Sequence, residues 1–161
     1  MSALPVYAES GKALYTWRSL SADMAQLAVN KAMLACRKKG YSVAVALVDR
    51  GGNLQAFVRD RFAGPHTPET AIRKAWTANS FRQDTTDLAV FLKKGQIPNQ
   101  VQHNPGALLV GGGVKIEAQG ELLGAIGVAG APPGKSERDS IDGRCAKAGV
   151  EAVREAIEFA D

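Results

Sequence analysis

The sequence is poor in aromatic residues and has no long apolar run. Phe, Trp and Tyr together make up 6% of the 161 residues, and the lysines and arginines are scattered, with a net charge of +4. A nucleic-acid interface needs a basic face with stacking aromatics, so we expect no nucleic-acid partner. No apolar stretch approaches the ~20 residues that cross a bilayer, so we expect no membrane insertion. A mildly basic chain of this kind suits a small anionic ligand better.

The first ten residues also lack the basic region and the apolar core of a secretory signal peptide. A chain from which such a peptide had been removed would look the same. The sequence therefore predicts a soluble protein and leaves its localisation open between the cytoplasm and a processed periplasmic or secreted chain.

Cysteine and histidine are scarce, with two residues of each. Cys36 and Cys145 lie far apart and neither belongs to a C-x-x-C pair, which argues against a zinc site. Both lie in helical patterns of small residues, so we predict buried structural thiols, while a disulfide depends on geometry that a sequence does not show. The two histidines, His66 and His103, are the candidates for any metal ligation or proton transfer.

The apolar periodicity predicts one α+β domain at residues 20–161, after an irregular arm at residues 1–19. Helical spacing predicts helices at about residues 21–39, 67–81, 84–93 and 137–159, and Thr67 is the expected N-cap of the second. Strand patterns occupy residues 43–48 and 54–59 around a turn. Residues 95–105 are predicted to form a loop. Residues 107–129 then form either three strands or two strands with a bulged entry.

Two glycine motifs resemble nucleotide-binding signals but fail on spacing or context. Gly130–Ser136 has the order of a P-loop, yet only three residues separate its glycines and two of those are prolines without an amide donor. Gly124–Gly127 resembles part of a dinucleotide fingerprint, but it lies inside a predicted strand. We therefore expect no nucleoside triphosphatase activity, and we expect a helix to pack closely on the strand glycines.

The candidate site combines both histidines with a glycine-rich stretch. His66 precedes a predicted helix start, where Arg61, Arg73 and the free amides near Thr67 make a plausible site for an anion or a carboxylate. His103 lies in the loop that enters Gly111, Gly112 and Gly113, whose missing side chains let the backbone or a ligand approach closely. A purely structural bulge at these glycines remains the alternative.

The chain resembles the GlcG/HbpS-like haem-binding proteins, a family that also includes the C-terminal domain of PduO-type corrinoid adenosyltransferases. The resemblance covers about residues 20–158 and rests on several elements in combination: Val45–Leu54, Phe62–Thr67, Lys74–Ala78, Pro105–Val114, Gly124–Val128 and Cys145–Gly149. It implies a bacterial protein with a profilin-like arrangement of α-β-α layers, a five-stranded antiparallel sheet, and homo-oligomers. It also implies binding of haem or another tetrapyrrole in some members.

Three functions follow as hypotheses. The first is a haem or related ligand-binding protein, with His66 or His103 as the iron ligand. The second is a small catabolic enzyme with isomerase-like or lyase-like acid–base chemistry, in which either histidine moves protons, Arg61 or Arg73 holds a carboxylate, and the Gly111–Gly113 backbone lines the pocket. The third is a non-catalytic oligomeric scaffold or sensor partner.

Overall fold

The computed structural model describes residues 14–136 and 138–160, so most of the predicted arm at residues 1–19 lies outside the described part. Residues 14–19 are mostly exposed and have no regular secondary structure. The elements that follow are, in chain order, α1 (Ala22–Arg37), β1 (Ala44–Asp49), β2 (Leu54–Arg59), α2 (Thr67–Phe81), α3 (Thr85–Lys93), the 3-10 helix η2 (Asn99–His103), β3 (Gly113–Ala118), β4 (Glu121–Ala129) and α4 (Ile141–Glu158).

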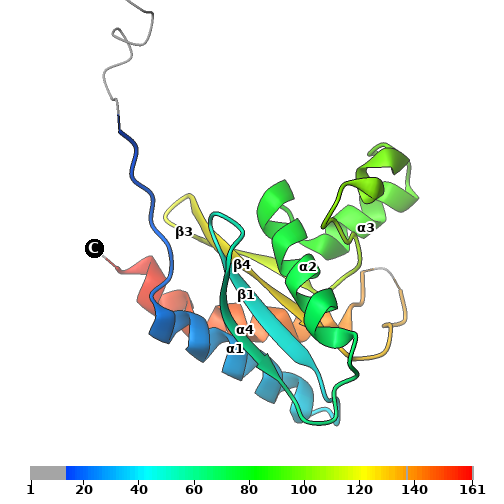
Figure 1. Cartoon of the computed structure of the whole chain (residues 1–161), viewed down its shortest axis with the longest axis horizontal. Helices are drawn as coiled ribbons and strands as arrows, with labels where there is room; N and C mark the ends of the chain where they lie inside the picture. The colour runs from blue at the N-terminus through cyan, green and yellow to red at the C-terminus, as the bar shows by residue number, and fades with distance from the viewer. Residues whose placement is uncertain (1–13, 137, 161) are drawn as a thin grey trace, which may run out of the picture.

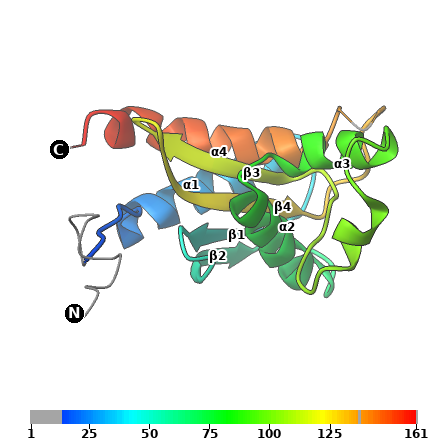
Figure 2. The same cartoon turned by 90° about the horizontal axis from the view of Figure 1, so that it is seen from above.

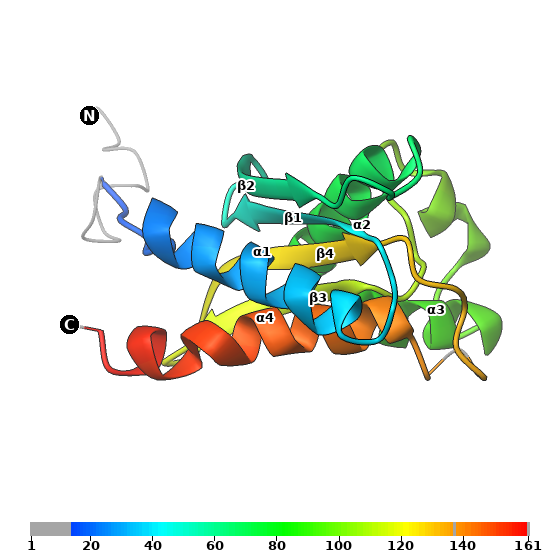
Figure 3. The same cartoon turned by 90° about the horizontal axis from the view of Figure 1, so that it is seen from below.

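The strands form one antiparallel sheet in the order β2-β1-β4-β3 (Figure 1). Helices α1 and α4 lie side by side on one face, and α2 covers the other (Figures 2 and 3). The α+β class is therefore confirmed. None of the described helices is long and apolar enough to cross a membrane.

The central strand β1 is buried on both faces, as its continuous apolar run predicts. Val45 and Leu47 belong to the core beneath α1 and α4, while Ala44 and Ala46 pack with Ala71 of α2. Small residues on this second face let α2 approach the sheet closely. The predicted close packing on the strand glycines is present, because a Cβ on Gly127 would lie 2.1 Å from the Ala71 carbonyl oxygen.

The prediction of five strands is wrong, since the sheet in the described residues has four. The missing strand is the apolar stretch 107–110, in which two backbone groups bond to side chains of α2 and two amides bond to nearby backbone carbonyls. The Thr77 hydroxyl accepts the Leu108 amide at 2.8 Å, and the Arg73 guanidinium donates to the Ala107 carbonyl at 2.8 Å. With these groups engaged, the segment offers no ladder to a neighbouring strand.

Several predicted boundaries also shift. The N-cap of α2 is His66, and Thr67 is the first helical residue, whose hydroxyl donates backwards to the Gly64 carbonyl at 2.7 Å. The last helix begins at Ile141 rather than near residue 137, because the Ser140 hydroxyl accepts the Gly143 amide and caps it there. A short 3-10 helix also occupies part of the predicted loop at 95–105.

The predicted burial of both cysteines is confirmed, and the structure answers whether they are paired, which the sequence left open. Cys36 and Cys145 are both fully buried, as expected, and they form a disulfide with a Cα–Cα distance of 5.5 Å. The bond joins the last turn of α1 to the second turn of α4. Residues so far apart in sequence can meet only through the helix pairing, which the sequence pattern does not reveal.

Candidate functional site

An open cavity of about 750 Å³ lies where α3, the end of β4 and the start of α4 meet. The last turn of α3 and the segment 110–111 form one side. Residues 131–136, Arg138 and the first turn of α4 form the other. The volume falls within the ~300–1,000 Å³ that small-molecule sites usually occupy. This cavity is therefore the candidate functional site, and we call it the α4 cavity.

The lining of the α4 cavity is basic on its rim and apolar on its walls. Its basic residues are Lys74, Lys93, Lys94, Lys135 and Arg138, and its apolar ones are Val90, Val110, Ala131, Pro132 and Pro133. Asp142 is the acidic residue among the lining residues in the described part of the chain. A cleft lined by one sign of charge concentrates ligands of the opposite sign, so this arrangement suits an anion with an apolar body.

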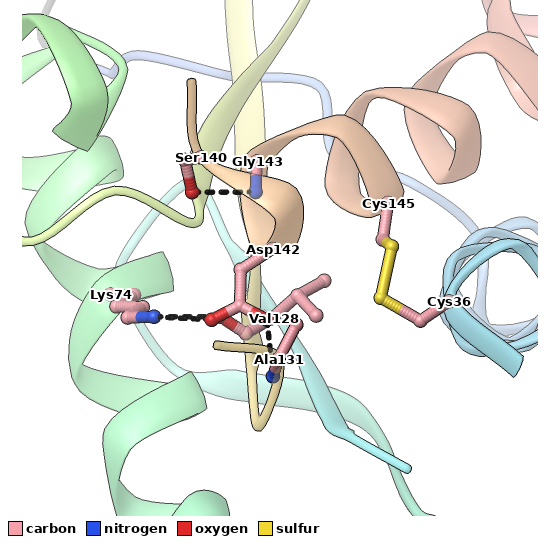
Figure 4. Close-up of a disulfide and its surroundings, with 8 residues drawn as sticks. All are labelled: Cys36, Lys74, Val128, Ala131, Ser140, Asp142, Gly143 and Cys145. Atoms are coloured by element: carbon pink, nitrogen blue, oxygen red, sulfur yellow. Dashed lines mark hydrogen bonds and ion pairs between the residues drawn. A yellow bond between two sulfur atoms is a disulfide. The ribbon is translucent and has the colours of Figure 1, made fainter. Parts of the chain in front are cut away.

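A buried ion pair forms the inner end of the α4 cavity. Lys74 comes from α2 and is 4% exposed, and Asp142 comes from the first turn of α4 and is 6% exposed. The Lys74 Nζ atom lies 2.8 Å from Asp142 Oδ2 and donates a second hydrogen bond to the Val128 carbonyl at 3.1 Å (Figure 4). The pair therefore joins α2, β4 and α4 at one point.

Asp142 also holds the loop that forms one wall of the cavity. Its other carboxylate oxygen, Oδ1, accepts the Ala131 amide at 3.0 Å. Both carboxylate oxygens are thus bound, one to an ammonium group and one to the backbone. The segment Gly130–Ser136, which fails as a P-loop, is held in this way as a wall of a cation-lined cavity.

The glycine-rich stretch makes room for protein atoms as well as for the cavity. A Cβ on Gly112 would lie 2.9 Å from Lys74 Nζ, and one on Gly113 would lie 2.2 Å from the Lys74 carbonyl oxygen. Gly111 lines the cavity, where a Cβ would lie 2.7 Å from the Ser140 Cβ. Two of the three glycines therefore permit the close passage of Lys74, and one faces the candidate site.

The structure places the predicted site residues apart from the α4 cavity, Gly111 excepted. His66 is exposed at the start of α2, with its ring over Gly64, and Thr67 is buried beneath it. The Arg61 guanidinium lies 4.6 Å from the centre of the Phe62 ring, and both residues line a second cavity of about 570 Å³. His66 and Thr67 are not among the lining residues of that second cavity.

Arg73 and His103 belong to a third region. The Arg73 guanidinium donates to the carbonyl oxygens of Gly106 and Ala107, so it fastens the incoming loop to α2. His103 ends the 3-10 helix and is exposed. Neither histidine is among the lining residues of the α4 cavity. Residues 14–136 and 138–160 contain no group of three or more His, Cys, Asp or Glu side chains that would hold a metal ion.

Sequence reasoning missed Lys74 and Asp142 as site residues. A signal for Lys74 was present, because it lies on the same helical face as Ala71, Ala75 and Ala78, all of which are fully buried. A lysine on a buried alanine face requires a buried counter-charge. Asp142 follows the N-cap of α4 closely and is easily mistaken for an acid that complements the helix dipole.

A model of the family described as "Haem degrading protein HbpS-like" matches residues 20–151. Protein GlcG of Escherichia coli (strain K12) is 29% identical over 109 residues, which cover 68% of this chain and 80% of GlcG.

Two solved structures have the same fold as this chain. A double mutant of HbpS from Streptomyces reticuli is 36% identical, with a TM-score of 0.78 over 95% of this chain and 99% of that one. A complex of PduOC with haem has a TM-score of 0.72 at 24% identity, over 83% of this chain and 94% of that one. At that identity the second likeness supports the fold alone.

Proposed function

The chain belongs to the HbpS-like family, and we propose that it binds haem or a related anionic tetrapyrrole in the α4 cavity. The observation that carries the proposal is the cavity itself, which combines a rim of exposed cations with apolar walls. A tetrapyrrole with acidic side chains has the matching form, a flat apolar ring with carboxylates at one edge. The PduOC–haem complex lends support through its shared fold.

Three rim cations offer a direct test of this ligand class. We expect the triple substitution Lys94→Ala, Lys135→Ala, Arg138→Ala to weaken haemin binding by about tenfold or more, since each lost ion pair is worth ~0.2–1 kcal/mol. The measurement is a haemin titration followed by the Soret band, repeated at high salt, which screens exposed charges. The matched control removes three exposed lysines elsewhere, Lys31, Lys38 and Lys39, and should bind as the wild type does.

Iron ligation is a separate part of the proposal. His66 and His103 are the two histidines of the chain and remain the proposed iron ligands, but neither lines the α4 cavity, so ligation by either would require a haem bound outside that cavity. The double substitution His66→Ala, His103→Ala tests this, because loss of an imidazole ligand moves the Soret band. An unchanged band in that variant would refute histidine ligation. Equal binding of metal-free protoporphyrin would show that the carboxylates and the ring suffice.

The alternative, an enzyme that acts on a carboxylated metabolite, has less support from the positions of its proposed catalytic and binding residues. Arg73 is engaged with backbone carbonyls, and His66 and His103 lie outside the lining of the α4 cavity. Turnover of an organic acid that is lost in His103→Ala would favour the alternative over simple binding.

We also propose that the chain forms homo-oligomers, as the sequence resemblance implies. The described part of the N-terminal arm presents Leu14, Tyr15 and Trp17 to solvent, with exposures of 87%, 78% and 62%. Clustered exposed apolar side chains of this kind mark association surfaces. Sedimentation of the purified protein gives the test, and a monomer at all concentrations would refute self-association. That result would also argue against the third hypothesis, a non-catalytic oligomeric scaffold or sensor partner.

A further inference from the structure

The disulfide lies in a closely packed part of the helix pair that supports the α4 cavity. Cys36 and Cys145 are fully buried where α1 meets α4. One turn further along α4, a Cβ on Gly149 would lie 2.6 Å from the Ala28 carbonyl oxygen and 2.9 Å from the Ala32 Cβ. Because backbone approaches backbone here, α4 cannot move closer to α1 and can move only away from it.

The cavity wall depends on the turn of α4 that the disulfide holds. Asp142 precedes Cys145 by three residues, so the two lie on neighbouring turns of one helix face (Figure 4). The Asp142 carboxylate fixes both Lys74 and the Ala131 amide, and both of these residues line the cavity. A displacement of this turn therefore moves the wall and the inner end of the cavity together.

We propose that the Cys36–Cys145 disulfide keeps the α4 cavity in the shape that binds ligand, so that the redox state of these two residues controls the site. The consequence for ligand affinity rests on the proposed function, whereas the consequence for the shape of the cavity does not. A dithiol is the reductant by chemical class. Its two thiols become a disulfide while Cys36 and Cys145 gain two electrons and two protons, through a mixed-disulfide intermediate.

The direction of the movement follows from how each cysteine is anchored. Two unbonded sulfurs cannot stay at bonding distance, since non-bonded heavy atoms prefer roughly 3.5–4 Å. Cys36 lies in a fixed segment, because its carbonyl accepts the amides of Lys39 and Tyr41 and the adjoining Arg37 pairs with Asp60. The first turn of α4, in contrast, follows a loop in which most of residues 131–136, 138 and 139 are exposed. The α4 side therefore moves, and the Asp142 contacts loosen.

The loop itself provides a readout that needs no ligand. Lys135 and Arg138 are exposed in it, and trypsin cleaves after both residue types. We expect native-state tryptic cleavage at these two positions to become at least tenfold faster after reduction with dithiothreitol. Hydrogen exchange at the Ala131 and Gly143 amides, both of which are bonded to side chains at this turn, should accelerate in parallel. Unchanged cleavage and exchange would overturn the proposal.

Two variants separate local loosening from general loss of stability. The double substitution Cys36→Ala, Cys145→Ala should cleave as the reduced wild type does and should not respond to dithiothreitol. Val153→Ala removes a buried side chain, 1% exposed, from the far part of α4 and leaves the disulfide intact. It should lower global stability without selective opening of the loop. Equal opening in Val153→Ala would show a global effect and would also overturn the proposal.

Ligand binding is then compared between the wild type and the double cysteine variant, so that no thiol reductant meets the haem iron. We expect at least a tenfold loss of haemin affinity in the variant. Faster loop cleavage with no haemin binding to either protein would refute the proposed function and leave the control of cavity shape supported. Equal haemin affinity of both proteins would refute redox control of binding.

Discussion

Lys74 is an ammonium group at 4% exposure whose charge is met by a single carboxylate. Removing one partner of a buried pair leaves the other without compensation, at a cost of about 3–5 kcal/mol. We therefore expect Asp142→Asn to lower the free energy of unfolding by about that amount. Asparagine keeps an oxygen for the Ala131 amide, so the loss reports the charge. Urea denaturation monitored by circular dichroism measures it.

Two comparisons make this result specific to the pair. Lys74→Met combined with Asp142→Asn removes both charges, so the double variant should be more stable than Asp142→Asn alone. Glu151→Gln changes an exposed carboxylate on the same helix and should shift stability by no more than about 0.5 kcal/mol. A double variant as unstable as the single one would contradict charge compensation.

Asp60 couples stability to pH. A hydrogen bond from the Arg37 guanidinium, 2.9 Å away, holds the pKa of this carboxyl below its ordinary value of 3.8, and the Arg61 amide adds to the effect. A carboxyl with a lower pKa in the folded chain binds protons more readily when unfolded. Its contribution to stability is therefore present above the ordinary value and is lost as pH falls through the folded value.

The matching variant is Asp60→Asn. We expect it to be less stable than the wild type above about pH 5, where the Asp60 carboxylate is ionised. As pH falls below the ordinary value of 3.8, the two free energies of unfolding should converge. Denaturant titrations at a series of pH values measure the gap, and a gap that stays constant into acid would contradict the role of Arg37.

At the residue scale, the sequence predicts which residues make close contacts better than it predicts the groups that they contact. The close approach at the glycine stretch was foreseen from its missing side chains, but the approaching group proved to be Lys74. Arg73 was expected to hold a ligand carboxylate, yet it binds loop carbonyls. The direction from which a loop returns to a helix is a tertiary property, so local pattern cannot select between these partners.

The contact between α2 and β4 depends on a single missing methyl group. A Cβ on Gly127 would lie 2.1 Å from the Ala71 carbonyl oxygen and 2.6 Å from the Ala75 amide nitrogen, and backbone atoms cannot rotate away. We expect Gly127→Ala to cost about 3 kcal/mol, the upper part of the range for overpacked cores. Thermal or urea unfolding measures the cost.

Gly95→Ala is the control for that substitution. Gly95 has a φ of +67° and open space around its Cβ position, so its cost reflects backbone conformation alone, about 1–2 kcal/mol. A cost for Gly127→Ala no larger than this would show that α2 shifts without penalty.

At the scale of elements, apolar periodicity predicts the helices and the buried strand correctly. It fails where side chains form hydrogen bonds with the backbone of an apolar segment. β1 and β2 lie within one residue of their predicted bounds because apolar runs and turn residues agree there. The stretch 107–110 has the same apolar character. The Leu108 amide and the Ala107 carbonyl are nevertheless bonded to Thr77 and Arg73, and the stretch forms no strand. Only the packing of α2 decides between those outcomes.

At the scale of the whole molecule, one disulfide links two residues that lie far apart in the sequence. Cys36 and Cys145 are separated by 109 residues, and the closed loop contains the entire sheet and α2. Cross-links that close loops of this size restrict the unfolded chain strongly, which corresponds to ~4.7 kcal/mol for a loop of 100 residues in the chain-entropy model. We therefore expect Cys36→Ala, Cys145→Ala to lower the free energy of unfolding by about 2–5 kcal/mol.

The comparison is made in urea, with the wild type both oxidised and reduced. Reduced wild type and the double variant should unfold at similar urea concentrations, well below the midpoint of the oxidised protein. The oxidised protein should also show a smaller m-value, since its cross-linked unfolded state exposes less surface. Coincident unfolding of all three forms would mean that the helix pair holds itself together without the bond, and the disulfide would then act on the α4 cavity alone.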